Sequence, residues 1–463
     1  MKKYKHSFIV ELIKACNVAL VTLGLAIGWI IFYGEEFARS LVRWENWILA
    51  IIFGTIYFVF GRTYDAFKVS IYSIPEMFLG QSLSLLCSDM LVYLMMTMLE
   101  RNWALPYPML ISLGIQLILS LAWCFGSNKL YYKLFKPKKT ILLYDKSEVF
   151  ERSIHDGRFD KKFNVEAVCS IHEVIDDIGR LDEYDTVFVN GVHSHERNII
   201  LKYCISKDIE MYVIPRMGDV IMSGAEKVNM FHFPLMRVQR YSPPVPYIVL
   251  KRVFDIAASA AGLIILSPVI LITALLIKLS DGGPVLYKQV RLTKDGKEFM
   301  IHKFRSMRVN AEGDGVARLS TGAKDDRVTP IGKFIRKVRI DELPQLFDIF
   351  IGNLSVVGPR PERPEIAKQY EKTLPEFKLR LQVKAGLTGY AQVYGKYNTT
   401  PYDKLQMDLM YIANPSILMD MKICFATVKI LFMPDSTEGI EEGAVTAMGK
   451  EGKTPKKERI ATK

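Results

Sequence analysis

The chain has 463 residues, half of them hydrophobic, and a formal net charge of +12. Its length has room for two or three domains, and its apolar content is high for a soluble protein. Excess positive charge can serve nucleic acid, anionic lipid or phosphorylated substrates. The six cysteines include no Cys-x-x-Cys pair, which argues against a disulfide framework or a zinc site and favours a reducing compartment.

Four apolar segments near the N-terminus have the length and composition of membrane helices, and residues 1–126 are expected to form a four-helix transmembrane bundle. The expected spans are residues 8–33, 44–60, 77–99 and 109–125. The second is near the lower limit for crossing a bilayer. Lysine and arginine are concentrated before the first span, after the second and after the fourth. Because cationic loops stay in the cytoplasm, both ends of the bundle are expected there.

Residues 140–241 alternate short apolar runs with helical patterns, which predicts a small parallel sheet of Rossmann type. The runs are residues 141–144, 165–168, 186–189 and 210–214. A nucleotide site in such a fold needs a glycine-rich turn after the first strand. Residues 144–148 contain no glycine, so we expect a structural or regulatory Rossmann-like cytoplasmic domain and not a dinucleotide site.

Two stretches mark the boundaries of a third domain. Residues 242–246 are rich in proline, which fixes φ and interrupts regular structure, so a domain linker is expected there. Residues 434–463 are charged and poor in apolar side chains, which predicts a disordered tail. The third domain is therefore expected at residues 246–433.

This third domain opens with a fifth apolar segment, residues 253–279, that could also enter a membrane. Ser267-Pro268 lies at its middle, where proline removes a helical hydrogen bond and bends the axis. Lys251 and Lys278 stand near its two ends, and cationic ends are retained in the cytoplasm. We expect a re-entrant helix that dips into the bilayer and returns. The alternative is a proline-kinked helix that spans it.

The densest group of chemically useful residues lies between 325 and 361. Asp341 and Glu342 precede an apolar helical pattern, and Pro344 suits the first turn of a helix. The pair is therefore expected at a helix N-terminus, where anions are favoured. A carboxylate can attack phosphorus as a nucleophile, and a neighbouring carboxylate can hold Mg²⁺ together with substrate phosphates. The nearby cations suited to phosphate oxygens are Arg336, Arg339 and Arg360.

Each of these features has an alternative interpretation when it is taken alone. An Asp-Glu pair at a helix start is usually a cap. Pro359-Arg360-Pro361 could be only a rigid turn. Basic residues beside membrane segments attract anionic lipid. The same clustering beside membrane segments argues against nucleic acid as a partner.

Residues 251–433 closely resemble the bacterial sugar transferase family, the monotopic phosphoglycosyl transferases. The matching landmarks, in order, are Lys251-Arg252-x-x-Asp255, Ser267-Pro268, Gly283-Pro284, Gln289, Arg291, Lys303-Phe304-Arg305-Ser306-Met307, Asp326-Arg327-Val328-Thr329, Asp341-Glu342-Leu343-Pro344-Gln345, Ser355, Val357-Gly358-Pro359-Arg360-Pro361, Gly386-Leu387-Thr388-Gly389, Gln392, Asp408, Tyr411, Ser416, Asp420 and Thr427. The four preceding spans and the Rossmann-like domain are similar to the large members of this family.

The resemblance implies a role for individual residues. Asp341 would be the nucleophile, Glu342 its Mg²⁺-binding partner, and Arg336 a contact of the carrier-lipid phosphate. The expected substrate-binding set is Arg336, Arg360, Lys303, Arg305, Arg327, Pro359 and Pro361. The chain departs from the common family pattern at Ala385, Arg339 and Asp348, which bear on substrate fit more than on activity.

The fold class implied is a four-span α-helical bundle, a Rossmann-like α/β domain and a mainly α (α+β) monotopic catalytic domain with a re-entrant helix. The implied activity is transfer of sugar-1-phosphate from a UDP-sugar to undecaprenyl phosphate through a phosphosugar-aspartyl intermediate, releasing UMP. It would start capsule or exopolysaccharide synthesis on the cytoplasmic face of the bacterial inner membrane. A homo-oligomer and downstream glycosyltransferases are compatible partners. The rival function is a transporter or assembly scaffold with a degenerate cytoplasmic domain.

Overall fold

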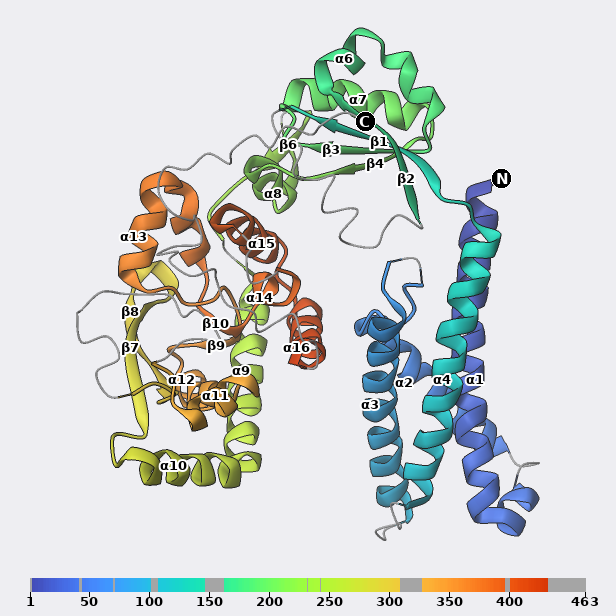
Figure 1. The fold of residues 1–463 in the computed structure, drawn as a ribbon, viewed down its shortest axis with the longest axis vertical. Coiled ribbons are helices and arrows are strands. Elements are labelled where there is room, and N and C mark those ends of the chain that lie inside the picture. The colour runs from blue at the N-terminus through green and yellow to red at the C-terminus, as the bar shows by residue number, and fades with distance from the viewer. Residues whose placement is uncertain are drawn as a thin grey trace, which may run out of the picture. The chain divides into compact units, whose positions relative to one another are not determined.

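A computed structural model describes residues 2–40, 44–69, 71–100, 107–145, 162–230, 232–241, 243–308, 327–395 and 400–431. The chain divides into two compact units, Met1–Pro215 and Arg216–Lys463. Figure 1 draws both units. The predicted tail at 434–463 and the pair Asp325-Asp326 lie outside the described residues.

The first unit opens with four apolar helices. They are α1 (Lys2–Ser40), α2 (Trp44–Thr63), α3 (Ile74–Glu100) and α4 (Tyr107–Leu134). Three of them contain a segment long and apolar enough to cross a membrane, and the apolar part of α2, Trp47–Thr63, is shorter. The protein is therefore a membrane protein, and the expected four helices are found, with three meeting the requirement for a span on length and composition.

Small residues let α1 and α4 approach closely. A Cβ atom at Gly28 would lie 2.0 Å from the Ser112 hydroxyl oxygen, and one at Gly24 would lie 3.1 Å from Gln116. This Gly-x-x-x-Gly spacing is typical of packed membrane helices. Polar side chains also join the helices inside the bundle, as where Tyr57 donates a hydrogen bond of 2.7 Å to Asn17.

The predicted parallel sheet is confirmed in the same unit. Its strands are β1 (Lys138–Tyr144), β2 (Phe163–Ser170), β3 (Thr186–Asn190) and β4 (Glu210–Val213), in the order β2-β1-β3-β4. All the pairings are parallel. The accompanying helices are α6 (Ile171–Asp176), η2 (Ile178–Glu183) and α7 (Ser194–Ser206). Buried apolar side chains between sheet and helices form the core, among them Ile141, Val187 and Ile200.

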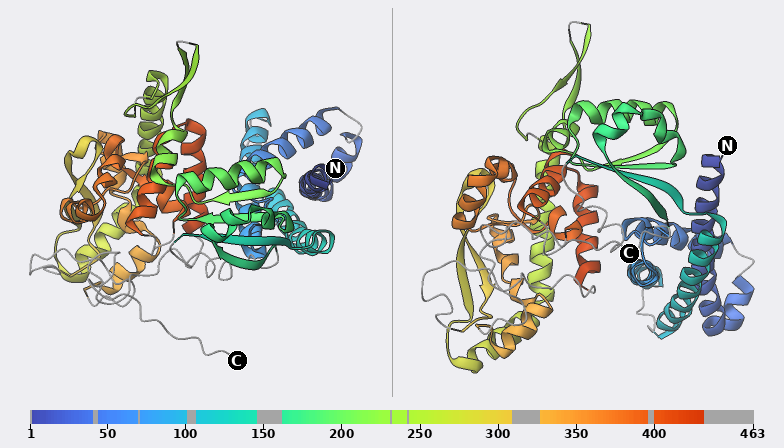
Figure 2. Two further views of the ribbon diagram at one scale, coloured as in Figure 1. Left: turned by 90° about the horizontal axis from the view of Figure 1, so that it is seen from above. Right: turned by 45° about the horizontal axis from the view of Figure 1, so that its top comes forward.

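The second unit begins with α8 (Met217–Ser223) and an exposed hairpin of β5 (Glu226–Met230) and β6 (Phe233–Arg237), which extends away from its neighbours (Figure 2). Val220 of α8 is buried in the main hydrophobic core of this unit, together with Leu405 and Leu409. This core therefore includes residues that precede the proline-rich linker.

The fifth apolar segment is a bent helix pair, as the central proline predicts. It consists of α9 (Val245–Ile265) and α10 (Ser267–Asp281), which are bent by 61°. The break falls at Leu266, directly before Ser267-Pro268. Proline is well tolerated there because it occupies the first turn of α10, where its missing N–H has no helical partner.

The remainder of the unit is mostly helical. The strands are β7 (Leu286–Leu292), β8 (Glu298–Phe304), β9 (Ser355–Val357) and β10 (Gly386–Thr388), which form an antiparallel hairpin and a short parallel pair. The helices are η3 (Lys294–Gly296), α11 (Pro330–Lys337), η5 (Ile340–Glu342), α12 (Gln345–Ile351), α13 (Pro364–Thr373), η6 (Pro375–Gln382), α14 (Tyr390–Tyr394), α15 (Pro401–Ala413) and α16 (Ile417–Leu431). Helix α12 packs against both β8 and α9.

Candidate active site

The Asp341-Glu342 pair lies on η5, in the short connection between α11 and α12. Thr329 caps α11 by accepting a hydrogen bond of 2.9 Å from the Gly332 N–H. After α11 ends, Arg339 adopts a left-handed conformation with φ of 58° and turns the chain into η5. The pair therefore lies on a 3₁₀ turn that leads into α12, and not in the first turn of the α-helix itself.

Glu342 is held by a group of cations. Its Oε1 atom lies 2.9 Å from Lys303 Nζ and 3.3 Å from Arg360 Nη2, and its Oε2 atom lies 4.0 Å from Arg339 Nη1. Burial alone raises the pKa of Glu342, but Lys303, followed by Arg360 and Arg339, outweighs it and holds the pKa well below its usual range. Glu342 is therefore ionised and fixed in place.

Asp341 has the opposite environment, although it is the adjacent residue. Only 9% of it is exposed. Within the described part of the chain, no hydrogen bond or ion pair engages its carboxylate. Burial raises the pKa of Asp341, and the negative charge of Glu342 raises it further, against Lys303, Arg336 and Arg339. The two carboxyl groups are thus driven apart in pKa, which is typical of groups with separate chemical roles.

Lys303 links the two acids electrostatically. It is the penultimate residue of β8, and burial lowers its pKa while Glu342 opposes that change. Among the cations that lower the pKa of Asp341 and of Glu342, its ammonium group has the largest effect on both. The predicted site residues Lys303, Asp341, Glu342 and Arg360 are therefore together in one site. Arg336, in the last turn of α11, lowers the pKa of Asp341 through its positive charge.

Arg360 lies on the backbone turn that follows β9, at the end of the parallel pair β9–β10. Gly358 donates a hydrogen bond of 2.8 Å to the Thr388 carbonyl, and the Pro359 carbonyl accepts one of 2.9 Å from Gly386. A Cβ atom at Gly358 would lie 2.3 Å from the Lys384 carbonyl oxygen, so only glycine fits this crossing. The backbone directly before Arg360 is therefore held by two hydrogen bonds and a close backbone contact.

Arg291 supports the same turn from β7, a role that its position in the sequence does not indicate. Its Nη1 atom donates a hydrogen bond of 3.0 Å to the Pro361 carbonyl, and its Nη2 atom donates one of 2.6 Å to Gln289. Burial lowers the pKa of Arg291 to about 10. Pro359 and Pro361 are thus each held through the backbone carbonyl, Pro359 by the Gly386 N–H and Pro361 by Arg291.

For two predicted substrate-binding residues, Arg305 and Arg327, the structure shows contacts other than those around Glu342. The Arg305 guanidinium packs against Gly283 and lines a small pocket with Thr329 and Ile331. The Arg327 carbonyl accepts a backbone hydrogen bond of 2.9 Å from Arg308. The structure gives Arg305 a place between α10 and α11 and does not bring it to the Glu342 carboxylate.

The three departures from the common family pattern each have a defined structural setting. The Ala385 N–H donates a hydrogen bond of 3.2 Å to Thr293, which a proline could not do. Arg339 adopts the left-handed conformation that leads into η5, which few non-glycine residues do. Asp348 is fully buried and bonds His302 through both the ring, at 2.7 Å, and the backbone N–H, at 2.9 Å.

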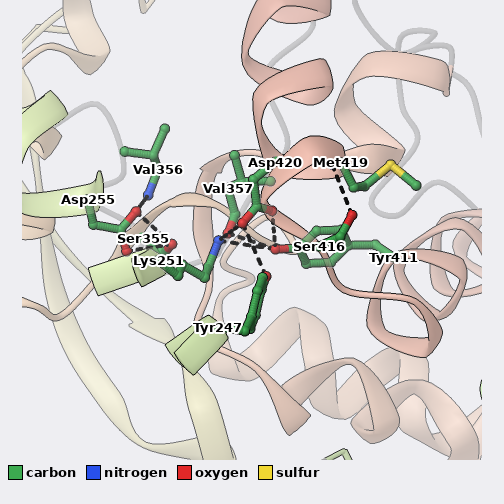
Figure 3. Close-up of polar contacts among 10 residues, drawn as sticks. All are labelled: Tyr247, Lys251, Asp255, Ser355, Val356, Val357, Tyr411, Ser416, Met419 and Asp420. Atoms are coloured by element: carbon green, nitrogen blue, oxygen red, sulfur yellow. Dashed lines mark hydrogen bonds and ion pairs between the residues drawn. The ribbon is translucent and has the colours of Figure 1, made fainter. Parts of the chain in front are cut away.

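Buried charged contacts that join distant parts of the chain are not predicted by the sequence. Lys251 lies 2.9 Å from Asp420, and Asp255 accepts hydrogen bonds from Ser355 and from the Val356 backbone (Figure 3). Another joins Arg380 to Asp408 at 2.7 Å. Several of these residues are family landmarks, but their spacing in sequence gives no indication of which of them meet.

The site has two carboxylates that could bind a metal ion, which is too few protein ligands to complete a coordination shell. Among the residues that the structure describes, no three His, Cys, Asp or Glu side chains converge on one point. Mg²⁺ usually takes only one or two carboxylates and completes its shell with water and substrate phosphates. The Asp341-Glu342 pair fits an ion held jointly with a phosphorylated substrate.

A carboxylate pair surrounded by lysine and arginine, on a domain that opens with a bent apolar helix pair, defines a class of membrane-attached proteins suited to phosphorylated ligands. Residues 246–434 match the family described as bacterial sugar transferase. The chain belongs to this family, since it is 43% identical over 190 residues to an exopolysaccharide production protein, PSS, of Rhizobium leguminosarum bv. phaseoli, covering 94% of that protein and 39% of this chain.

Other relatives have names that specify a reaction. An Aeromonas hydrophila UDP-N-acetylgalactosamine-undecaprenyl-phosphate N-acetylgalactosaminephosphotransferase is 37% identical over 234 residues, covering 50% of this chain and 54% of the relative. A Klebsiella pneumoniae UDP-glucose:undecaprenyl-phosphate glucose-1-phosphate transferase is 39% identical over 212 residues, covering 45% and 43%. The similarity thus spans about half of these two relatives or less.

Proposed function

We propose that this protein transfers a sugar-1-phosphate from a UDP-sugar to undecaprenyl phosphate, giving a polyprenyl-diphosphate-sugar and UMP. The observation that supports this most is the contrast between the two acids: among the described residues the Asp341 carboxylate makes no hydrogen bond or ion pair, and Glu342 is bound by Lys303 and Arg360. The names of two relatives support the same substrates, and the name of a third specifies exopolysaccharide production. We propose that the reaction stands at the start of exopolysaccharide or capsule synthesis.

The reaction takes place in two displacements at phosphorus. In the first, an Asp341 oxygen forms a bond to the sugar-bearing phosphorus, and the bond from that phosphorus to the UMP oxygen breaks. In the second, an oxygen of undecaprenyl phosphate attacks the same phosphorus and releases Asp341 as a carboxylate. A covalent intermediate divides one difficult step into two easier ones.

The cations of the site neutralise the charge that develops during both displacements. Arg360 and Lys303 stand at the Glu342 carboxylate, where they are fixed before substrate binds. Fixed donors need no reorganisation during the reaction, so they stabilise charge more effectively than water does. Arg336 is assigned to the phosphate of the carrier lipid, while Arg305 and Arg327 remain candidates for binding elsewhere on the substrates.

Glu342 is the residue assigned to Mg²⁺, with Asp341 beside it. A bound Mg²⁺ would neutralise the charge on the leaving phosphate. The Glu342 carboxylate remains ionised because the cations hold its pKa low, so it carries the negative charge that a Mg²⁺ ligand needs. The residues of this chain that act directly in the proposed displacements are Asp341, Lys303 and Arg360.

We further propose that α1–α4 form four spans and that α9–α10 re-enters the membrane and returns to the cytoplasmic face of the inner membrane. The 61° bend at Leu266 and the cations Lys251 and Lys278 near the two ends support a dip. The domains would be residues 1–126, 140–241 and 246–433. The short apolar part of α2 is the weakest element of this arrangement.

The test is UMP release from a panel of UDP-sugars by the full chain in membranes supplied with undecaprenyl phosphate. A transferase releases UMP with one or a few of the sugars and forms a radiolabelled lipid product. The rival function, a lipid-glycan transporter or scaffold, has no use for the buried carboxylate pair and predicts no UMP with any of them. The assay therefore separates the two functions directly.

A further inference from the structure

Three charged residues in one turn and a half of α9 each bind a different element of the second unit. Lys251 bonds Asp420 of α16 at 2.9 Å. Arg252 donates hydrogen bonds of 2.8 Å to the carbonyls of Ile349 and Phe350, at the end of α12. This part of the re-entrant helix therefore contacts more of the domain's interior than membrane attachment requires.

The third residue, Asp255, is 3% exposed and is directed at β9 (Figure 3). Its Oδ2 atom accepts a hydrogen bond of 2.9 Å from the Ser355 hydroxyl, and its Oδ1 atom accepts one of 2.9 Å from the Val356 N–H. Bonds to an ionised acceptor are about twice as strong as those between neutral groups. Asp255 therefore fixes both the position and the rotation of the strand.

The strand that Asp255 holds leads directly to the candidate active site. β9 ends at Val357, and the next three residues are Gly358, Pro359 and Arg360. The backbone between Asp255's contacts and Arg360 has little freedom, because Gly358 is hydrogen-bonded to Thr388 and Pro359 to Gly386. A displacement of β9 is therefore transmitted to the Arg360 guanidinium.

We propose that Asp255 is a positioning residue for the reaction: from the re-entrant helix, it fixes β9 so that Arg360 reaches Glu342. The inference rests on the proposed function, because it assigns Asp255 to that same active site. Asp255 acts through Arg360 and touches no substrate. In this way the helix that attaches the domain to the membrane also sets the geometry of the cation beside the carboxylate pair.

The variant Asp255→Asn keeps the size of the side chain and removes its charge. One side-chain oxygen remains as acceptor, so one of the two β9 bonds is lost or weakened. We expect kcat for UMP release by the full chain in nanodiscs to fall about tenfold, because errors of about 1 Å in the placement of a catalytic group can cost up to a hundredfold. Ser259→Ala is the matched control, because Ser259 is also buried on α9 but bonds only to backbone carbonyls of its own helix.

A double-mutant cycle distinguishes positioning of Arg360 from a general loss of structure. Arg360→Lys retains the charge and loses the planar fork, and radiolabelled UDP-sugar keeps its reduced activity measurable. If Asp255 acts through Arg360, Asp255→Asn should cost less than about threefold in the Arg360→Lys background, since effects of residues that act as a unit are not additive. An equal loss in both backgrounds would overturn the proposal, as would an unchanged kcat of Asp255→Asn alone.

A second variant serves as the control for loss of folding. If Asp255→Asn melts at a temperature too low for assay, Ser355→Ala takes its place in the same cycle, because it removes the hydroxyl bond and leaves the Val356 bond intact. Coupling to Arg360 supports the inference, and additivity rejects it. Failure of the unmodified protein to release UMP would instead reject the proposed function, so the two failures are distinguishable.

Discussion

The two parallel-strand arrangements of this protein differ in what surrounds the carboxyl ends of their strands. In the four-stranded sheet of the first unit, Gly191 follows β3 with φ of +70°, and a Cβ atom there would have no atom of the described residues within 4 Å. In the two-stranded pair β9–β10, a Cβ atom at Gly358, Gly386 or Gly389 would lie within 2.3 Å of another residue's backbone. Backbone packing therefore leaves no room for a side chain at these three glycines, whereas at Gly191 the described residues leave that room.

The charges near these ends differ in the same way. At the larger sheet, the Asp145 side chain is 11% exposed and lies 3.6 Å from His193 and 3.8 Å from His172, two largely exposed side chains that carry charge only when protonated. Beyond β9, the Glu342 carboxylate is 14% exposed and lies among lysine and arginine. Both carboxylates are largely buried, and buried charges require fixed partners; cationic lysine and arginine surround Glu342, whereas among the described residues histidines lie beside Asp145. The comparison supports our proposal that the chemistry belongs to the second unit.

The largest expected effect in that unit is at Asp341, the proposed nucleophile. Asp341→Asn removes the attacking carboxylate and should lower UMP release by about 10³-fold or more, and Glu342→Gln should nearly abolish it. Asp341→Asn should leave the melting temperature close to that of the unmodified protein, whereas Glu342→Gln should lower it, because Lys303 and Arg360 lose the carboxylate that neutralises them. The measurement is UMP release in purified membranes; full activity of Asp341→Asn would disprove the covalent mechanism.

The next largest effect tests the difference in backbone packing. Gly358→Ala places a methyl group 2.3 Å from the Lys384 carbonyl oxygen, so the strand must shift. We expect a loss of about 1–3 kcal/mol in the free energy of unfolding and a marked loss of activity, because Arg360 follows two residues later. The measurements are denaturant unfolding and UMP release.

Gly218→Ala in α8 is the matched control for this variant. It has no atom within 4 Å of the new methyl group, and alanine is favoured over glycine in a helix. Its stability should be unchanged or slightly higher. Equal tolerance at Gly358 and Gly218 would show that the close approach at β9–β10 does not constrain the site.

A smaller effect is expected in the pH dependence of activity. The nucleophile must be ionised, and the pKa of Asp341 is raised, so activity should fall on the acid side at a pH above the ordinary aspartate value of about 3.9. Lys303→Met removes a cation that lowers the pKa of Asp341. That pKa therefore rises further, and the acid limb of kcat/KM moves to higher pH.

The control for the pH experiment is Lys384→Met, the same substitution at a lysine that bonds the Gly352 carbonyl and is not among the cations that shift the pKa of either acid. Its profile should match that of the unmodified protein. An acid limb that stays in place in Lys303→Met, at reduced or full activity, would contradict the assignment of this limb to Asp341.

Local patterns predict the elements of this fold better than they predict the site. Apolar runs locate the four strands of the larger sheet, and Pro268 locates the break at Leu266. The contact of Lys303 with Glu342 joins residues 39 apart, and no periodicity encodes such a distance. The left-handed Arg339, which puts the acids on a 3₁₀ turn, is likewise set by tertiary packing.

The smallest expected effect is that of removing the first unit. We predict that residues 246–433 are active in membranes, within about tenfold of the full chain, because every residue assigned to chemistry lies there and α9–α10 supplies membrane attachment. The Rhizobium relative supports this, since the matched region makes up 94% of its length. The measurement is UMP release by the membrane-bound fragment.

The boundary of this fragment can be refined with a second one. Val220 of α8 is buried against the core of the second unit, and the Tyr241 N–H donates a hydrogen bond of 3.0 Å to Gln382. Removing residues 216–245 uncovers this apolar surface, and fully burying one valine is worth about 1.5–3 kcal/mol. A fragment of residues 216–433 should therefore melt at a higher temperature than 246–433 and have the same kcat. A folded, membrane-bound 216–433 fragment without activity would show that the first unit contributes directly to the reaction, and the contrast between the two units would then fail.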